Sequence, residues 1–407
     1  MGGELFVVGA ALLLAGLFGW VGRKIGLPTI PFFIVAGIAF GPHTPGVVLL
    51  ERPDEIYLLA VLGLVLLLFH LGIEFSINDL LAGGRRLIWA GGSYIALNFG
   101  AGLALGLWLD WGTREIFVIA GMIGTSSTAI VTKLLMDLRR IDNPEAGMIL
   151  GIIVFEDVFL AFYLALLQPI LGEQEGAVAI ASSTAVAFAV LIGLFALARW
   201  GGRFVRPLIS GGDRELTTIL LVGFGVSVAG LAHVAGASDA VGALMAGMVV
   251  AGTGLGHRVE ALVVPLRDTF AAIFFFWFGL TIAPTAMGAI AMPVVIAVVV
   301  TLTFNVVAGV VAARIYGYGP VEAANAALML VSRGEFELIL ASLAVAAGLD
   351  ERVAPFAALY VLVLSIFSPL ASARSDVLAR LLPGRLFADP SWRRQTVARG
   401  ERVSGPA

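Results

Sequence analysis

The sequence predicts an all-α polytopic membrane protein with about thirteen transmembrane helices in two inverted six-helix repeats. First, 59% of the 407 residues are hydrophobic and only 13% are charged, far outside the usage of soluble globular proteins. Second, apolar runs of about 20 residues recur between short loops, and lipid admits such runs only as helices. Third, the two halves of the chain match weakly when one is shifted by 207 residues along the other.

The apolar segments predict the individual spans, which we list in chain order. They are residues 5–22, 28–41, 55–73, 87–109, 115–136, 144–167, 176–199, 215–234, 238–252, 267–283, 288–313, 321–346 and 354–379. The residues before the first span lack the basic region of a signal peptide, so we expect this span to be retained as a helix. No stretch is polar enough to predict a sizeable soluble domain.

The basic residues predict which ends of the spans face the cytoplasm. If the N-terminus lies outside, almost all lysines and arginines fall in inner loops, at inner span ends or in the tail, and only Arg52, Arg114 and Arg352 lie outside. This asymmetry predicts a multi-pass protein of the cell (inner) membrane with a cytoplasmic C-terminus. Arg333 alone falls deep within a span.

The internal match predicts two structural repeats. A shift of 207 or 210 residues superposes small and polar residues of equivalent spans: Gly72 on Gly279, Asn98 on Asn305 and Gly37 on Gly247. Equivalent spans are separated by an odd number of spans, so the repeats have opposite topology, which is typical of transporters with a substrate site near the midplane. We expect a first repeat at residues 1–167, a linker helix at 168–207, a second repeat at 208–380 and a short Arg-rich cytoplasmic tail at 381–407.

Two adjacent acids, Glu156 and Asp157, lie near the middle of the predicted span 144–167. A charged side chain at this depth costs about 2.5–3.5 kcal/mol on insertion scales. Successive helical residues point about 100° apart, so both acids avoid lipid only if they face protein or a water-lined cavity. An intramembrane acid is therefore a candidate functional group, and the alternative is a buried structural hydrogen-bonding or ion-pairing group.

Polar segments in the middle of two further spans predict broken helices. The segments, which the repeat places opposite each other, consist of Thr125, Ser126, Ser127 and Thr128 in one span and Ser332, Arg333, Gly334 and Glu335 in the other. Hydroxyl groups and water can satisfy the backbone groups that a break frees. Half-helix ends and unwound carbonyls can then coordinate a small cation beside Asp157. The alternative for the hydroxyl-rich segment is close helix packing through small residues.

Other intramembrane polar residues need partners. We expect Arg333 to pair with Glu335 or Glu337 and so to hold the two broken helices together, or else to take part in ion binding. Asn98 and Asn305 are expected to form hydrogen bonds between helices, or to line a pore.

Composition and the remaining ionisable groups exclude several function classes. The net charge of −3 predicts no nucleic-acid partner, and the absence of cysteine excludes disulfides and thiolate chemistry. His70 and Glu74, at the inner end of their span, are expected to be interfacial, with a pH-sensing pair as the alternative. No cofactor is expected beyond the transported ions.

Taken together, these residues resemble the Kef-type monovalent cation:proton antiporters. The similar segments run from about Leu5 to Leu378 and include Gly151–Asp157, Ser126–Ile130, Ser332–Phe336 and Phe274–Gly279. The resemblance implies a sodium/proton-antiporter-like fold with crossed broken helices, a dimerisation domain and a mobile core. It also implies that Asp157 is the transporting, cation-binding aspartate, and that Glu156 and Thr125–Thr128 complete the ion site.

Three departures from the family pattern affect the mechanism. Many relatives have Gln, Asn or Asp at the position of Glu156, and some have lysine at the position of Asn305, which argues against a lysine–aspartate pair here. Kef-type proteins often carry a cytoplasmic nucleotide-binding domain. This sequence ends soon after its Arg-rich tail, so any regulatory subunit is expected to be a separate polypeptide. The resemblance also implies a homodimer.

We therefore expect a secondary antiporter that exchanges K⁺ or Na⁺ for protons at a midplane carboxylate by alternating access. A sodium-coupled organic anion symporter of the same fold is one alternative, and Arg333 is its only intramembrane candidate for holding the anion. A cation channel is a second alternative. An intramembrane hydrolase using Ser126 or Ser127 would need a general base, and no histidine lies in the middle of a span.

Overall fold

The computed structural model describes residues 2–44, 48–50, 52–74, 84–172, 202, 205–207, 209–210, 213–234 and 239–387. Within these residues every regular element is helical. The predicted span at 176–199, and with it most of the predicted linker helix, lies outside the described residues, as does the tail from residue 388 onward.

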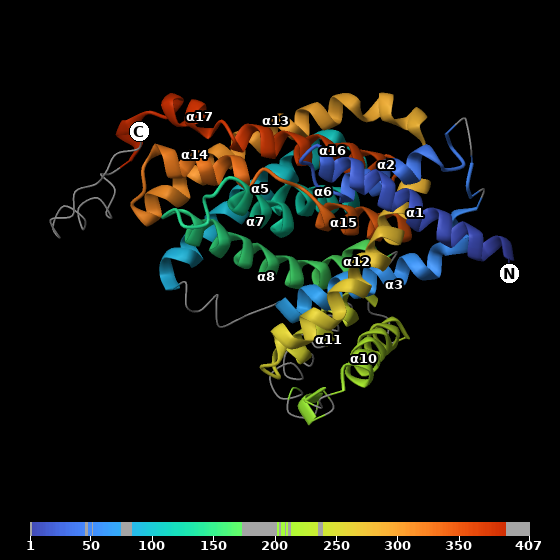
Figure 1. Ribbon diagram of the computed structural model, residues 1–407. Coiled ribbons are helices and arrows are strands. Elements are labelled where there is room, and N and C mark those ends of the chain that lie inside the picture. The colour runs from blue at the N-terminus through green and yellow to red at the C-terminus, as the bar shows by residue number, and fades with distance from the viewer. Residues whose placement is uncertain are drawn as a thin grey trace.

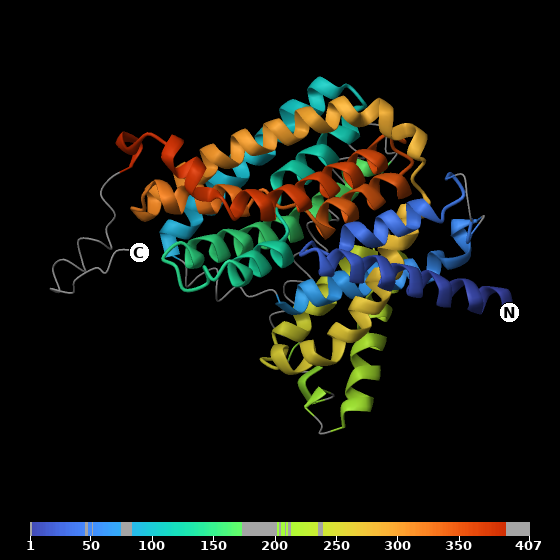
Figure 2. The ribbon, with the colours of Figure 1, turned by 45° about the horizontal axis from the view of Figure 1, so that its top comes forward.

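The helices form two bundles (Figures 1 and 2). The first bundle consists of α1 (Gly2–Lys24), α2 (Ile30–Ala39), α3 (Tyr57–Glu74), α10 (Arg214–Val234), α11 (Asp239–Ala251) and α12 (Gly256–Leu280). The second bundle consists of α5 (Gly84–Leu109), α6 (Thr113–Gly124), α7 (Thr128–Asp137), α8 (Ala146–Leu171), α13 (Met287–Tyr316), α14 (Pro320–Met329), α15 (Glu335–Ala346), α16 (Val353–Ser372) and α17 (Ser375–Leu381). Contact between the bundles is mainly that of α16 with α2 and of α11 with α8.

Nine helices of the described chain are long and apolar enough to cross a membrane. The predicted spans 28–41 and 238–252 contain shorter apolar helices, α2 with 10 residues and α11 with 13 residues. The predicted span 321–346 consists of two short helices, α14 and α15. The predicted spans therefore correspond to helices wherever the structure describes them, although some are too short to cross a bilayer alone.

Glycine pairs bring helices of the first bundle into backbone contact. A Cβ atom added at Gly37 of α2 would lie 2.9 Å from the Cα atom of Gly279 on α12, and one added at Gly72 of α3 would lie 2.9 Å from the Cα atom of Gly247 on α11. Small residues permit this approach, which strengthens van der Waals packing where lipid provides no hydrophobic driving force between helices. The four glycines are members of the pairs that the sequence repeat superposes.

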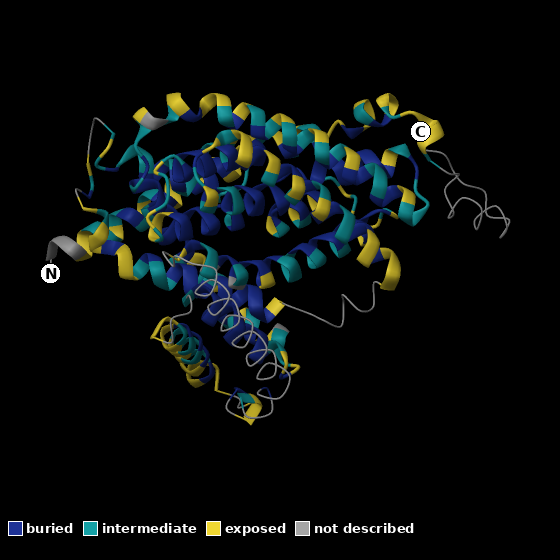
Figure 3. Ribbon diagram, turned by 180° about the vertical axis from the view of Figure 1, so that it is seen from behind, coloured by how far each residue is buried: buried dark blue, intermediate teal, exposed yellow. Residues whose placement is uncertain are grey.

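Exposed and buried residues lie on different faces of the bundles (Figure 3). Large apolar side chains, among them Leu5, Leu13 and Leu231, are exposed on α1 and α10, as expected of surfaces that contact lipid. By contrast, α14 and α15 are almost wholly buried in the second bundle. The polar groups around the helix breaks therefore lie inside protein.

Candidate ion site at the crossing of two broken helices

Two helices of the second bundle are interrupted, and their interruptions meet. The chain leaves helical geometry at Thr125–Ser127, between α6 and α7, and again at Leu330–Gly334, between α14 and α15. The amide of Ser127 donates a hydrogen bond to the carbonyl oxygen of Ser332 at 3.1 Å, which joins the two segments. Both interruptions therefore satisfy part of their freed backbone through each other.

The beginning of α15 has its own cap. The carboxylate Oε2 of Glu337 accepts a hydrogen bond from the amide of Gly334 at 2.7 Å, which satisfies a donor that the start of a helix leaves free. Gly334 has no room for a side chain, because a Cβ atom there would lie 2.5 Å from Oγ of Ser127. The crossing thus needs a glycine on one side and a small residue on the other.

Asp157 lies on α8 beside the start of α7. The hydroxyl of Thr128 lies 3.1 Å from Oδ1 and 3.2 Å from Oδ2 of Asp157, so it donates to this carboxylate. The Asp157 side chain is only partly buried. Its neighbour Glu156 is more deeply buried.

Glu156 points into the interior of the second bundle and is 1% exposed. Its Oε2 atom accepts hydrogen bonds from the amide of Ser126 at 2.7 Å and from the hydroxyl of Ser126 at 2.6 Å. Its Oε1 atom is buried and has no hydrogen-bond partner within the described part of the chain. Glu156 therefore binds Ser126 in the middle of the interruption, and Asp157 binds Thr128 at the start of α7.

Ser127 connects the crossing to a third acid. Its hydroxyl donates to Oε2 of Glu335 at 3.1 Å, and Glu335 is the first residue of α15. A negative charge at a helix N-terminus is favourable because the peptide dipoles point their positive end there. Through Ser127, Glu335 thus belongs to the surroundings of the candidate ion site.

Arg333 is completely buried and ties the interruptions together. Its Nη2 atom donates to the carbonyl of Ile123, at the end of α6, at 2.9 Å, while Nη1 donates to the carbonyl of Leu330 at 2.9 Å within its own interruption. Of the two glutamates considered as partners, Glu337 is the ion-pair partner, with Nε 3.7 Å from Oε1. Glu335 binds Ser127 instead.

Asn98 and Asn305 meet between α5 and α13. The side-chain amide of Asn305 donates to Oδ1 of Asn98 at 3.1 Å, and both residues are fully buried. Tyr94, which the sequence analysis did not single out, lies 2.8 Å from Oδ1 of Asn305 and 3.0 Å from the carbonyl of Leu330. Its position one helical turn before Asn98 in an apolar span is the signal that could have identified it.

This arrangement supplies oxygen ligands and exchangeable protons in one place. The carboxylate of Asp157 and the hydroxyl of Thr128 are hard oxygen donors, the ligand type that suits hard cations. A proton and a cation that bind the same carboxylate compete, because each neutralises the carboxylate and so lowers its affinity for the other. The site is therefore suited to exchanging one ion for the other.

Comparison with known proteins points the same way. Residues 9–373 match the family model described as sodium/hydrogen exchanger, transmembrane. The chain is 39% identical over 384 residues to the K(+)/H(+) antiporter subunit KhtU of Bacillus subtilis (strain 168), with 93% of this chain and 95% of that protein covered. It is 33% identical over 351 residues to the ammonium/H(+) antiporter subunit AmhT of Alkalihalophilus pseudofirmus, with 84% and 86% covered.

The fold is also that of a solved antiporter. The sodium proton antiporter MjNhaP1 from Methanocaldococcus jannaschii superposes with a TM-score of 0.66 at 14% sequence identity, over 91% of this chain and 98% of that one. At this identity the comparison establishes the fold and leaves the choice of ion to other arguments.

Proposed function

The chain belongs to the sodium/hydrogen exchanger family and is a monovalent cation:proton antiporter, and from this premise we propose that it exchanges potassium for protons at Asp157. The observation that carries the assignment is the contact of Asp157 with the hydroxyl of Thr128 at the edge of a helix interruption. The printed names of its relatives support potassium, because one of the most similar is a K(+)/H(+) antiporter subunit.

In this proposal Asp157 binds either the cation or protons, and Thr128 adds an oxygen ligand. Glu156 and Arg333 keep the two interruptions in place, Glu156 through Ser126 and Arg333 through the carbonyl of Ile123. If the second bundle moves only when Asp157 is neutralised by either ligand, exposing the site to each face in turn couples the two gradients.

The proposed architecture is two inverted six-helix repeats with thirteen spans in all, the seventh at 176–199. Helix positions support it, since a shift of 207 residues brings the range of each of α5, α6, α7 and α8 close to that of α13, α14, α15 and α16 respectively. The glycine crossings add support. The pair Gly37 and Gly279 becomes the pair Gly247 and Gly72 when each member is replaced by its repeat equivalent, and both pairs are in close contact.

The proposed setting is the cell membrane, with the N-terminus outside and the C-terminus in the cytoplasm. The concentration of basic residues at one set of span ends supports this orientation. We further propose a homodimer and a separate regulatory subunit. The second of these is supported by the printed names of two relatives, both of which are called subunits.

An organic anion symporter is disfavoured by the surroundings of Arg333. A substrate carboxylate would need a free guanidinium, but this one is 0% exposed and is engaged by backbone carbonyls and by Glu337. An antiporter needs no such positive group, so the geometry agrees with the family assignment.

The function is tested by ion exchange in proteoliposomes that contain a pH-sensitive dye. Adding K⁺ should move protons in the wild type, Na⁺ should do so less, and Asp157→Asn should abolish the response while Glu335→Gln retains part of it. Folding is checked by size-exclusion profile and thermal melting. A well-folded Asp157→Asn protein that exchanges like the wild type would contradict the role of Asp157, and a larger response to Na⁺ than to K⁺ would contradict the choice of cation.

A further inference from the structure

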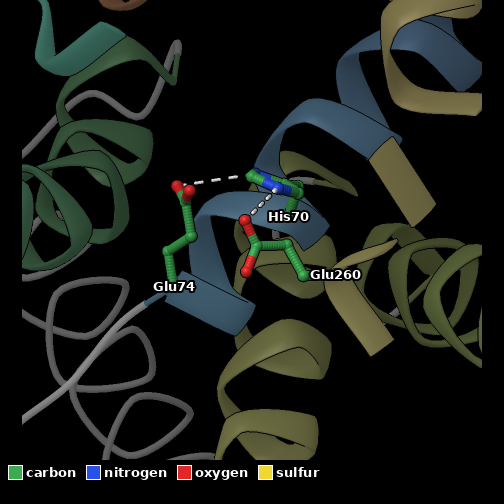
Figure 4. A group of neighbouring side chains, drawn as sticks. All are labelled: His70, Glu74 and Glu260. Carbon is green, nitrogen blue, oxygen red and sulfur yellow. Dashed lines mark ion pairs between the residues drawn. The ribbon is translucent and has the colours of Figure 1, made fainter. Parts of the chain in front are cut away.

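A second polar cluster lies in the first bundle, where α3 packs against α12 (Figure 4). His70 and Glu74 project from the last turns of α3, and Glu260 projects from the beginning of α12. One potential ligand atom from each residue lies within 4.8 Å of the other two. Nδ1 of His70 is 3.4 Å from Oε2 of Glu74, and Nε2 is 4.0 Å from Oε1 of Glu260.

We propose that His70, Glu74 and Glu260 form a binding site for a divalent transition metal ion, in competition with Arg267. One imidazole nitrogen and two carboxylates are a ligand set that suits Zn²⁺ or Co²⁺, with water in the remaining positions. Tetrahedral coordination at about 2.0–2.2 Å places ligand atoms about 3.3–3.6 Å apart. The three ligand atoms lie within 4.8 Å of one another, so they must approach by up to about 1.5 Å to bind one ion. The 3.4 Å and 4.0 Å contacts involve different ring nitrogens of His70, and only one of these nitrogens binds the ion.

The two glutamates can make the remaining adjustment. The side chains of Glu74 and Glu260 are 47% and 34% exposed, so their carboxylates can rotate, whereas the His70 side chain is 4% exposed and held by the packing of α3. The site thus combines one fixed nitrogen ligand with two adjustable oxygen ligands. The fixed ligand is also what distinguishes the cluster from a group of surface acids.

In the structure, the guanidinium group of Arg267 contacts the imidazole ring of His70. Its Nη1 atom lies 2.9 Å from Nδ1 and 3.2 Å from Nε2 of His70. A neutral imidazole has one acceptor nitrogen, because the other ring nitrogen carries a proton, so Arg267 donates to only one of the two. Asp268 offers Arg267 another partner, since Nε and Nη2 already donate to Oδ1 of Asp268. Arg267 can therefore leave His70 when a metal ion binds.

The position of the cluster gives metal binding a consequence for transport, and this part rests on the function proposed above. α11 packs against α3, which carries His70 and Glu74, and also contacts α8, which carries Asp157, so the cluster and the proposed ion site lie on helices that share a neighbour. A bound divalent ion would neutralise Glu74 and repel an approaching monovalent cation. We therefore expect metal binding at the cluster to inhibit ion exchange.

The site is tested by equilibrium dialysis of the purified tag-free protein against Zn²⁺, with metal content measured by mass spectrometry. Wild type should bind one Zn²⁺ per chain saturably. Glu260→Gln and His70→Gln should each weaken binding at least tenfold. Arg267→Gln should strengthen it several-fold, because the competing cation is gone. Glu215→Gln, an acid in the first turn of α10, serves as the matched control and should bind like the wild type.

Co²⁺ provides an independent readout, since a nitrogen and oxygen ligand set gives a visible absorption band that Glu260→Gln should reduce. Unchanged Zn²⁺ affinity in Glu260→Gln, or weaker binding in Arg267→Gln, would overturn the proposed site even if His70→Gln fails to fold. In liposomes, Zn²⁺ should slow exchange by the wild type and not by Glu260→Gln. If Zn²⁺ binds without slowing exchange, the metal site is supported and its proposed effect on transport is wrong. If the protein shows no exchange even without metal, that result contradicts the proposed transport function and not the metal site.

Discussion

The amide of Ser127 and the carbonyl of Ser332 form a hydrogen bond of 3.1 Å between residues 205 positions apart in the chain. Both groups belong to the backbone, and both are freed by the interruption of a membrane helix. Each interruption therefore completes the other, which explains how irregular backbone is tolerated inside a membrane protein. The same contact places Ser126 and Thr128 on either side of the crossing, where they meet Glu156 and Asp157.

Gly334→Ala should disturb this crossing directly. The added methyl group would lie 2.5 Å from Oγ and 2.8 Å from Cβ of Ser127, so the two interruptions must separate, at an expected destabilisation of about 1–3 kcal/mol. Thermal melting in detergent and proton exchange in liposomes should both decline. Gly288→Ala, where nothing lies within 4 Å of the added Cβ atom, should leave both unchanged. Equal behaviour of the two variants would argue against a tight crossing.

Thr128→Val should weaken cation binding more than folding. The substitution keeps the shape of the side chain but removes the hydroxyl that contacts Asp157, so the KM for the cation should rise several-fold. Thr128→Ser keeps the hydroxyl and should stay close to the wild-type KM. Exchange is measured over a range of cation concentrations, and an unchanged KM in Thr128→Val would mean that the hydroxyl is not a ligand.

Arg333→Met should destabilise the protein by about 3–5 kcal/mol, because it leaves the charge of Glu337 buried without its partner. The double variant Arg333→Met with Glu337→Gln should recover part of this loss, since the uncompensated charge is removed while an acceptor remains for the amide of Gly334. Arg380→Lys, at an exposed position, is the control. Thermal melting of the wild type, Arg333→Met, Glu337→Gln, the double variant and the control checks the prediction, and additive losses in the double variant would contradict it.

Asn98 and Asn305 should show coupling in a double-mutant cycle. Asn98→Ala and Asn305→Ala each remove one side of a buried hydrogen bond, and the double variant removes both. Hydrogen bonds between membrane helices average about 0.6 kcal/mol in such cycles, so we expect coupling of about 0.5–1.5 kcal/mol. Reversible unfolding in mixed micelles measures it, and strictly additive effects would argue that the contact contributes nothing.

Much of the fold follows from apolar length and from the internal repeat. The interruptions lie at Thr125–Ser127 and Leu330–Gly334, the segments in which glycine, hydroxyl groups and charge made a break expected. The partner of Arg333 could not be chosen from sequence, because Glu335 and Glu337 are two residues apart and point to different sides of α15. Because α15 begins at Glu335, Glu335 accepts a hydrogen bond from Ser127, whereas Glu337 forms the ion pair with Arg333.

The role of Tyr94 was also not evident from the sequence. A tyrosine in an apolar span is compatible with many environments, and its contact with Asn305 depends on how α5 packs against α13.

The sparse contact between the bundles has a consequence for the membrane around them. Because their backbones approach mainly where α16 touches α2 and α11 touches α8, we expect a movement of one bundle past the other to change which surface faces lipid. Hydrophobic mismatch costs fractions of a kcal/mol per Å of bilayer thickness. The thickness of the bilayer therefore becomes part of the energetics of each transport cycle, and lipids of different chain length should alter the turnover rate of an unchanged protein.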